Sequence, residues 1–192
     1  MMTNTHYFLA IPIPTSVKQL YLEWRELMKE QLPFKTWVHH EDYHITLVFL
    51  GEAPFTKVQD VKTEMKKIAA NHPAFTLKLS GLGYFGRQES PRIFWAGVDV
   101  SLQLTRLQKD IYEACERLGF MLEKRAYHPH MTLARRWGGE YEFPQGSLSD
   151  MMQPKDEHLE MKVENIVLYQ THLNRSPKYQ PLSIFSLGEN KG

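Results

Sequence analysis

Two short segments of the chain combine residue types that can move protons and hold anions. HITL (residues 44–47) and HMTL (residues 130–133) share the pattern His-x-Thr-Leu, and about two sequences in a thousand of this composition would carry it twice by chance. Both segments begin a stretch of high β propensity, where residues two apart face the same side, about 6.6 Å apart along the strand. Each segment is therefore predicted to present an imidazole and a hydroxyl together, with its apolar residues on the buried face.

Two such strands facing each other across a groove would suit the hydrolysis of a phosphodiester. One histidine would take a proton from the attacking water, the other would protonate the departing oxygen, and the threonine hydroxyls would hold the phosphoryl oxygens. Histidine suits both roles because its ordinary pKa, about 6.5, leaves both forms available near neutral pH. A single histidine on a strand is more often structural, so the prediction depends on the two segments together. The residues alone do not distinguish the acid from the base.

The rest of the chain provides strands and helices that can position these segments. Apolar periodicity predicts helices over residues 15–31, 56–70 and 101–118. A glycine-rich loop is expected over 81–92 and an irregular loop over 137–158. Strands outnumber helices without a sustained βαβ alternation, which favours an α+β fold with mainly antiparallel sheets. Runs rich in aromatic and β-branched residues predict strands over 6–13, 44–50, 75–82, 93–98, 130–135, 163–170 and 183–187.

Composition and charge restrict the class of protein. The chain has 192 residues, of which 42% are apolar and 23% charged, with a formal net charge of +1. The composition is typical of a globular domain. The net charge is too small for a protein that binds nucleic acid nonspecifically. Cys115 is the only cysteine, so no intrachain disulfide can form, and a cytoplasmic location is expected. No apolar run approaches the roughly 18 residues of a membrane span, and we expect a monomeric single domain over residues 1–192.

Metal and nucleotide sites find less support in the sequence. His39 and His40 with His44, or His128 with His130, could be proposed as metal ligands, but no His-Glu-x-x-His or similar spacing occurs. The glycine-rich loop lacks the lysine of a phosphate-binding loop. We therefore expect neither a metal nor a cofactor.

The chain also resembles the two-histidine (2H) phosphoesterase superfamily, and within it the bacterial RNA 2',3'-cyclic phosphodiesterases, historically called 2'-5' RNA ligases. The similar segments include HITLVFLGE (44–52), PRIFWAGV (91–98) and PHMTLAR (129–135), with 137–158 the least recognisable stretch. The resemblance implies a bilobal α+β fold, with two mainly antiparallel sheets in pseudo-twofold symmetry around a central cleft and helices on the outside. It also implies metal-independent hydrolysis of a 2',3'-cyclic phosphate to a 2'-phosphomonoester, at RNA 3' ends such as those of tRNA fragments or oligonucleotides.

The same resemblance implies roles for individual residues. His44 matches the proton donor to the leaving 3' oxygen, and His130 matches the base that activates water. Thr46 and Thr132 match residues that hold phosphate oxygens. Arg135 matches a basic residue that follows the second segment and could neutralise the phosphate.

The facing of Arg135 and of Phe49 poses a geometric difficulty. They lie five residues after His130 and His44 respectively, so strict alternation turns each away from its histidine. Arg135 can therefore reach the phosphate only if a bulge or a strand end intervenes. Phe49 could stack on a base, but core packing is the simpler expectation.

Three other functions remain open from the sequence. The same residues could join a cyclic-phosphate end to a 5'-hydroxyl through a 2'-5' linkage, although water at about 55 M competes with that reaction. The protein could bind RNA ends or phosphorylated ligands without turnover, although binding alone needs no second proton-transfer group. Metal-assisted hydrolysis would be revealed by sensitivity to EDTA.

Overall fold

A computed structural model describes residues 5–148 and 159–188. No helix within these ranges is both long and apolar enough to cross a membrane. The helices are α1 (Thr15–Met28), α2 (Phe55–Asn71) and α3 (Leu102–Arg117), with 3-10 turns η1 (His40–Asp42) and η2 (Gln145–Ser147). The strands are β1 (His6–Pro12), β2 (Phe34–Trp37), β3 (His44–Glu52), β4 (Phe75–Gly86), β5 (Pro91–Val98), β6 (His130–Trp137), β7 (Leu159–Val163), β8 (Asn165–Thr171) and β9 (Tyr179–Ser186).

The strands form an antiparallel sheet in two halves that meet at its centre. The strand order is β7-β4-β5-β6-β3-β1-β8-β9, and β2 also pairs with β6. Between β3 and β6 the only paired residues are Ile45 and Met131, so the halves diverge from that point. The expected α+β fold with mainly antiparallel strands is confirmed. The two expected sheets are joined at this pair into one sheet of nine strands.

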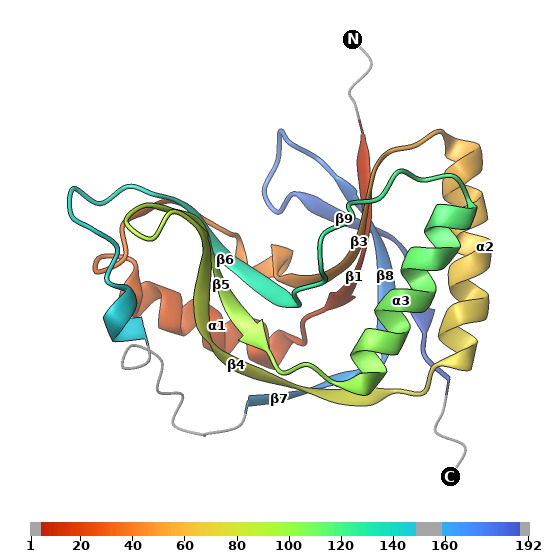
Figure 1. The fold of residues 1–192 in the computed structure, drawn as a ribbon, viewed down its shortest axis with the longest axis horizontal. Coiled ribbons are helices and arrows are strands. Elements are labelled where there is room, and N and C mark those ends of the chain that lie inside the picture. The colour runs from red at the N-terminus through yellow and green to blue at the C-terminus, as the bar shows by residue number, and fades with distance from the viewer. Residues whose placement is uncertain (1–4, 149–158, 189–192) are drawn as a thin grey trace.

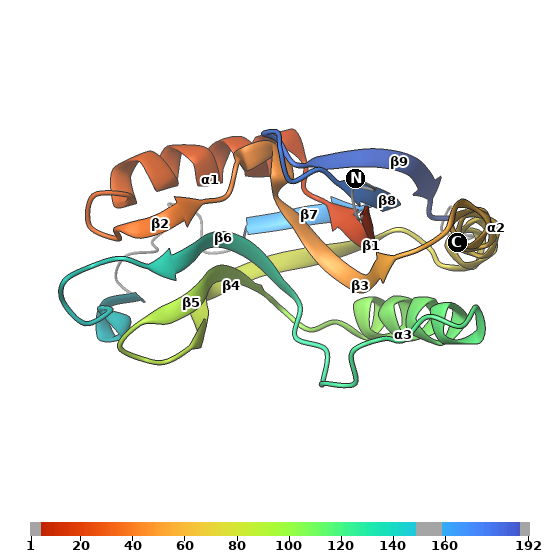
Figure 2. The same cartoon turned by 90° about the horizontal axis from the view of Figure 1, so that it is seen from above.

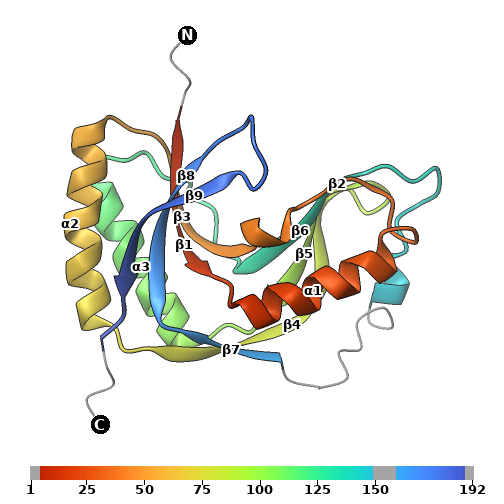
Figure 3. The same cartoon turned by 180° about the vertical axis from the view of Figure 1, so that it is seen from behind.

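The helices cover the outside of each half. α2 and α3 lie side by side, α2 against β8 and β9 and α3 against β3 (Figure 1). α1 covers the other half, where the Trp24 ring lies 6.3 Å from Trp37 of β2 and 6.2 Å from Phe94 of β5 (Figures 2 and 3). The two central strands therefore lie between the helices of the two halves, within one continuous hydrophobic core.

Helix boundaries follow from capping and from apolar periodicity. Ser101 caps α3 with its hydroxyl, which accepts the Leu104 N–H at 3.1 Å, and caps of this kind stabilise a helix by about 1 kcal/mol. The buried positions of α2 and α3 recur every three or four residues, as the periodicity predicts. They are Val58, Val61, Met65 and Ala69 in α2, and Leu104, Leu107, Ile111, Ala114 and Cys115 in α3.

The glycine-rich loop expected over residues 81–92 is wrong in its extent. β4 continues to Gly86 and β5 begins at Pro91, so most of that segment is a strand. Gly83 pairs with Trp95, and a Cβ atom on Gly83 would lie 2.2 Å from the indole ring. The glycine therefore provides room for an aromatic ring rather than a turn.

The irregular loop expected over 137–158 is only partly described by the structure, and two short strands were not predicted. Trp137 ends β6, η2 occupies Gln145–Ser147, and residues 149–158 lie outside the described residues. β2 and β7 were not predicted. Each is only four or five residues long, too short to produce a clear periodic signal.

Candidate catalytic site

The two His-x-Thr-Leu segments lie side by side on the central strands β3 and β6. The pair between Ile45 and Met131 is antiparallel, so its register places each histidine opposite the threonine of the other segment. Ile45 and Met131 are fully buried, whereas the histidines and threonines on the opposite face are partly exposed. This register brings the two imidazoles and the two hydroxyls to one face at the junction of the two halves, where β3 and β6 lie side by side (Figure 2).

The final leucine of each segment is the extra residue of a β-bulge. In β3, Leu47 is skipped in the register with β1, and in β6, Leu133 is skipped in the register with β5. Each leucine and the residue after it are both buried, so the alternation of faces is reset at the same place in both strands. Arg135 and Phe49 consequently lie on the side of the histidines. The expectation of core packing for Phe49 is wrong, because the residue is 55% exposed.

A main-chain carbonyl two residues earlier orients each imidazole ring. Nδ1 of His44 lies 2.7 Å from the carbonyl oxygen of Asp42, and Nδ1 of His130 lies 2.7 Å from that of His128. A carbonyl can only accept a hydrogen bond, so Nδ1 carries the proton in both rings and Nε2 is the nitrogen left for chemistry. The Thr46 hydroxyl lies 3.1 Å from Nε2 of His44 and can donate to it when the ring is neutral.

Burial keeps both histidines predominantly neutral in the absence of substrate. It lowers the pKa of His44 to about 4, against the opposing effect of Asp42. The pKa of His130 is also lowered, mainly by burial. The ring of His44 packs against Phe8 at 4.8 Å and Tyr179 at 5.1 Å, and the ring of His130 packs against Phe85 at 5.0 Å. An anion placed between the rings would raise both pKa values by favouring the charged forms.

Arg135 is the guanidinium that acts on both histidines at once. Its positive charge contributes to the lowered pKa of His44 and of His130, which places it near each of them. Burial raises the pKa of Tyr179, and the charge of Arg135 opposes that rise. A guanidinium in this position suits a phosphate held between the two rings.

Three side chains that the sequence analysis did not single out support the first segment. The Asp42 carboxylate accepts main-chain N–H groups from the start of β9. Tyr127 donates its hydroxyl to the Thr46 carbonyl at 3.2 Å, and Gln108 donates its amide to the Leu47 carbonyl at 3.4 Å. A bulge leaves carbonyls without ladder partners, and these two donors compensate for that loss. Each contact joins residues more than 60 positions apart, so no local pattern could have predicted it.

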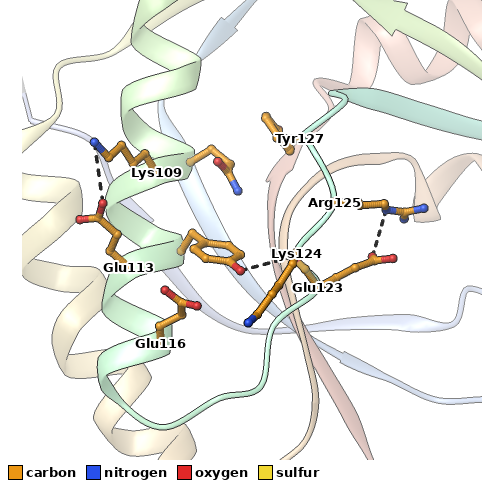
Figure 4. A pocket seen from close by; sticks show the side chains of 9 residues that line it. Lys109, Glu113, Glu116, Glu123, Lys124, Arg125 and Tyr127 are labelled. Atoms are coloured by element: carbon orange, nitrogen blue, oxygen red, sulfur yellow. Dashed lines mark hydrogen bonds and ion pairs between the residues drawn. The ribbon is translucent and has the colours of Figure 1, made fainter.

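Tyr127 and Gln108 also line a pocket beside the first segment. It lies between α3 and residues 119–129 (Figure 4) and has a volume of about 380 Å³. Acidic and basic side chains alternate around it, and two ion pairs form there, between Lys109 and Glu113 and between Arg125 and Glu123. The mixed charge is unlike that of a site for a polyanion.

The remaining histidine and glycine-loop candidates make packing or local hydrogen-bonding contacts. His39 and His40 stack on each other with ring centroids 4.6 Å apart. Within residues 5–148 and 159–188, no group of three or more His, Cys, Asp or Glu side chains is arranged to hold a metal ion. Of the aromatic residues at the end of β4, Phe85 reaches His130, whereas Tyr84 donates its hydroxyl to Gln145 at 2.6 Å.

Comparison with known proteins identifies the family. The family model of the 2'-5' RNA ligase superfamily matches residues 14–175. A Geobacillus stearothermophilus protein named RNA 2',3'-cyclic phosphodiesterase is 42% identical over 186 residues, which are 97% of this chain and 58% of that protein. The Bacillus subtilis protein of the same name is 37% identical over 183 residues, which are 95% of this chain and 96% of that protein.

Solved structures support the same assignment. Escherichia coli LigT complexed with 3'-AMP superposes with a TM-score of 0.79 at 25% identity, covering 96% of this chain and 99% of that chain. A Thermus thermophilus protein superposes with a TM-score of 0.77 at 26% identity and the same coverage. The family match extends over both His-x-Thr-Leu segments and the strands that carry them. The chain belongs to the 2'-5' RNA ligase superfamily, the two-histidine phosphoesterases.

Proposed function

We propose that this protein hydrolyses the 2',3'-cyclic phosphate at RNA 3' ends to a 2'-phosphomonoester, without a metal ion. The observation that carries the proposal is the symmetric pair of histidines at the β3–β6 junction, each oriented through Nδ1 with Nε2 left for chemistry. The relatives named RNA 2',3'-cyclic phosphodiesterase add support. Two proton-transfer groups around one anion are what the opening of a cyclic phosphodiester requires.

The reaction is a single in-line displacement at phosphorus. Nε2 of His130 accepts a proton from water as the water oxygen forms a bond to phosphorus. The bond between phosphorus and the 3' oxygen breaks, and the Nε2 proton of His44 passes to that oxygen. Proton exchange with solvent then restores both rings, so neither a covalent intermediate nor a redox step is needed.

The neighbouring side chains bind the phosphate and the base. The hydroxyls of Thr46 and Thr132 donate hydrogen bonds to the non-bridging oxygens, and Arg135 neutralises the charge that builds up on them. Phe49 stacks on the terminal base, for which its exposed ring is available. E. coli LigT has been solved with 3'-AMP, which supports a nucleotide site in this fold.

The substrate, assembly and location are part of the same proposal. The RNA 3' ends of tRNA fragments or oligonucleotides are the substrates, and the chain acts in the cytoplasm as a monomer and as one bilobal domain over residues 1–192. Light scattering at micromolar concentration tests the oligomeric state, where a dimer mass would contradict it. Comparing cyclic-phosphate mononucleotides with longer oligonucleotides tests the preferred substrate.

The decisive experiment follows the product of a defined oligoribonucleotide. The purified protein, with and without EDTA, is incubated with an oligoribonucleotide that ends in 2',3'-cyclic phosphate in ¹⁸O-labelled water. Phosphorus NMR and chromatography against authentic 2'- and 3'-phosphates identify the product, and mass spectrometry detects the ¹⁸O. A labelled 2'-phosphate in both reactions is expected. A 3'-phosphate would reverse the leaving group, and loss of activity with EDTA would contradict metal independence.

Variants of the two histidines test the mechanism. His44→Ala and His130→Ala should each lower the turnover rate by at least about 10²-fold, with circular dichroism unchanged. His72→Ala is a matched control, because His72 lies at the C-terminal end of α2 and pairs with Asp110. If either site variant keeps the wild-type rate, the two-histidine mechanism fails. A 2'-5' linked product with an added 5'-hydroxyl oligonucleotide, or binding without any product, would favour the ligase or the binding-module alternative.

A further inference from the structure

The two histidines have the same main-chain support but different side chains beside it. Each Nδ1 donates to the carbonyl of the residue two positions earlier, at 2.7 Å in both cases. That residue is Asp42 before His44 and His128 before His130. Asp42 is the only buried charged residue in the part of the chain that the structure describes, with 5% exposure, whereas His128 is exposed. The pseudo-symmetry of the site is therefore broken at this position.

The Asp42 carboxylate is anchored to the start of β9. One oxygen accepts the main-chain N–H groups of Lys178 and Tyr179, each at 3.0 Å, and the other lies 2.8 Å from the Lys178 nitrogen. These donors compensate for the burial of a negative charge, which would otherwise be costly. The Tyr179 ring in turn lies 5.1 Å from the His44 ring at an interplanar angle of 90°. Asp42 thus contacts the end of the β8–β9 loop through its carboxylate and the His44 ring through its main-chain carbonyl.

The charged groups around His44 differ from those around His130. Asp42 precedes His44, and β6 presents Arg135 and His130 to it, while β8 and β9 present the uncharged Tyr169 and Tyr179. Around His130, by contrast, the charged or titratable neighbours are all basic: His128, Arg125, Arg135 and His44. Phe85 of β4 and Trp95 of β5 complete its surroundings and carry no charge. A negative neighbour favours an imidazolium and positive neighbours favour a neutral ring.

We propose, resting on the proposed function, that Asp42 is a positioning residue that separates the roles of the two histidines. Its carbonyl orients the His44 ring, and its anchored carboxylate favours the protonated, proton-donating form of His44. Burial and, to a smaller extent, the basic neighbours of His130 favour the neutral ring that a general base needs. Burial opposes protonation of His44, so without the carboxylate only the hydrogen bond to the Asp42 carbonyl and the bound phosphate support the acid.

Asp42→Asn tests the charge with little change of shape. The asparagine keeps the main-chain carbonyl, and its side-chain oxygen can still accept from Lys178 and Tyr179. In the NMR titration of the histidine rings, the pKa of His44 should fall. At neutral pH, kcat/KM for the cyclic phosphate should fall up to about tenfold for each unit of that decrease, because only the protonated fraction donates. Asp60→Asn, at an exposed position of α2, is the matched control and should change neither quantity.

A second variant keeps the proposal testable if Asp42→Asn does not fold. His128→Asp introduces a carboxylate two positions before His130 at an exposed site, where it should not disturb folding. The pKa of His130 should rise, and the limb of the kcat/KM profile that His130 sets should move to higher pH. A folded Asp42→Asn with the wild-type His44 titration and rate, or a His128→Asp with an unchanged His130 titration, would overturn the proposal. Absence of hydrolysis by the wild-type chain would instead refute the proposed function, since the ring titrations do not depend on turnover.

Discussion

The stability of the protein should depend on pH through His44. Burial lowers its pKa from 6.5 to about 4 in the folded chain, whereas the unfolded chain keeps the ordinary value. Between these pH values the unfolded chain binds more protons, so the free energy of unfolding decreases as the pH falls from 6.5 towards 4. Linkage with these two pKa values gives a loss of about 2 kcal/mol between pH 7.5 and 5.0 from this residue alone.

The measurement compares the wild-type chain with His44→Asn. The asparagine amide can still donate to the Asp42 carbonyl, but it does not titrate. Urea unfolding at pH 7.5 and at pH 5.0 gives the free energy of unfolding of each protein, and subtraction cancels the other titrating groups. The variant should gain about 2 kcal/mol relative to wild type at the lower pH. If the difference between the two proteins is the same at both pH values, within about 0.5 kcal/mol, His44 is not a buried neutral histidine and the reasoning is wrong.

Three further predictions follow from the same geometry. The pH profile of kcat/KM should be bell-shaped with its maximum below pH 6.5, because the lowered pKa values of His44 and His130 define its limbs; a maximum above pH 7 in steady-state assays would contradict this. Gly83→Ala should lower the free energy of unfolding by about 1–3 kcal/mol, because the new Cβ atom displaces the Trp95 ring. It should also lower kcat, since that ring lies 6.1 Å from the His130 ring. Wild-type values in both denaturation and rate assays would show that the ring adapts. Phe49→Ala should raise KM by about 5- to 150-fold with a nearly unchanged kcat if its ring stacks on the base, and an unchanged KM would assign the exposed ring no such contact.

The chemistry of the site could be predicted from the sequence because it depends on local geometry. Residues two apart on a strand share a face whatever the rest of the fold does, so His44 and Thr46 were predicted to act together, as were His130 and Thr132. In the first segment His44 and Thr46 are joined by a hydrogen bond of 3.1 Å, a contact between residues only two positions apart. The helices were predicted for a similar reason, because apolar periodicity within one segment decides which face is buried.

The facing of residues beyond each segment depended on pairing with other strands. Phe49 and Arg135 lie on the side of the histidines only because Leu47 and Leu133 are skipped in the registers with β1 and β5. A bulge is a property of two strands, so a single strand's alternation predicted the opposite facing. The glycine-rich segment was assigned to a loop for a related reason, because the ring that covers Gly83 belongs to another strand.

The asymmetry between the two histidines likewise arises from distant residues. Before the strands are assembled, Asp42 is an ordinary acidic residue in a polar stretch. It becomes a buried carboxylate because main-chain N–H groups 136 and 137 positions away approach it at the start of β9. Local sequence thus specified which groups could transfer protons, since bonded geometry brings a histidine and its threonine together. Packing between distant strands decided their burial, their charged neighbours and therefore their protonation, since these depend on groups that only the folded chain brings near.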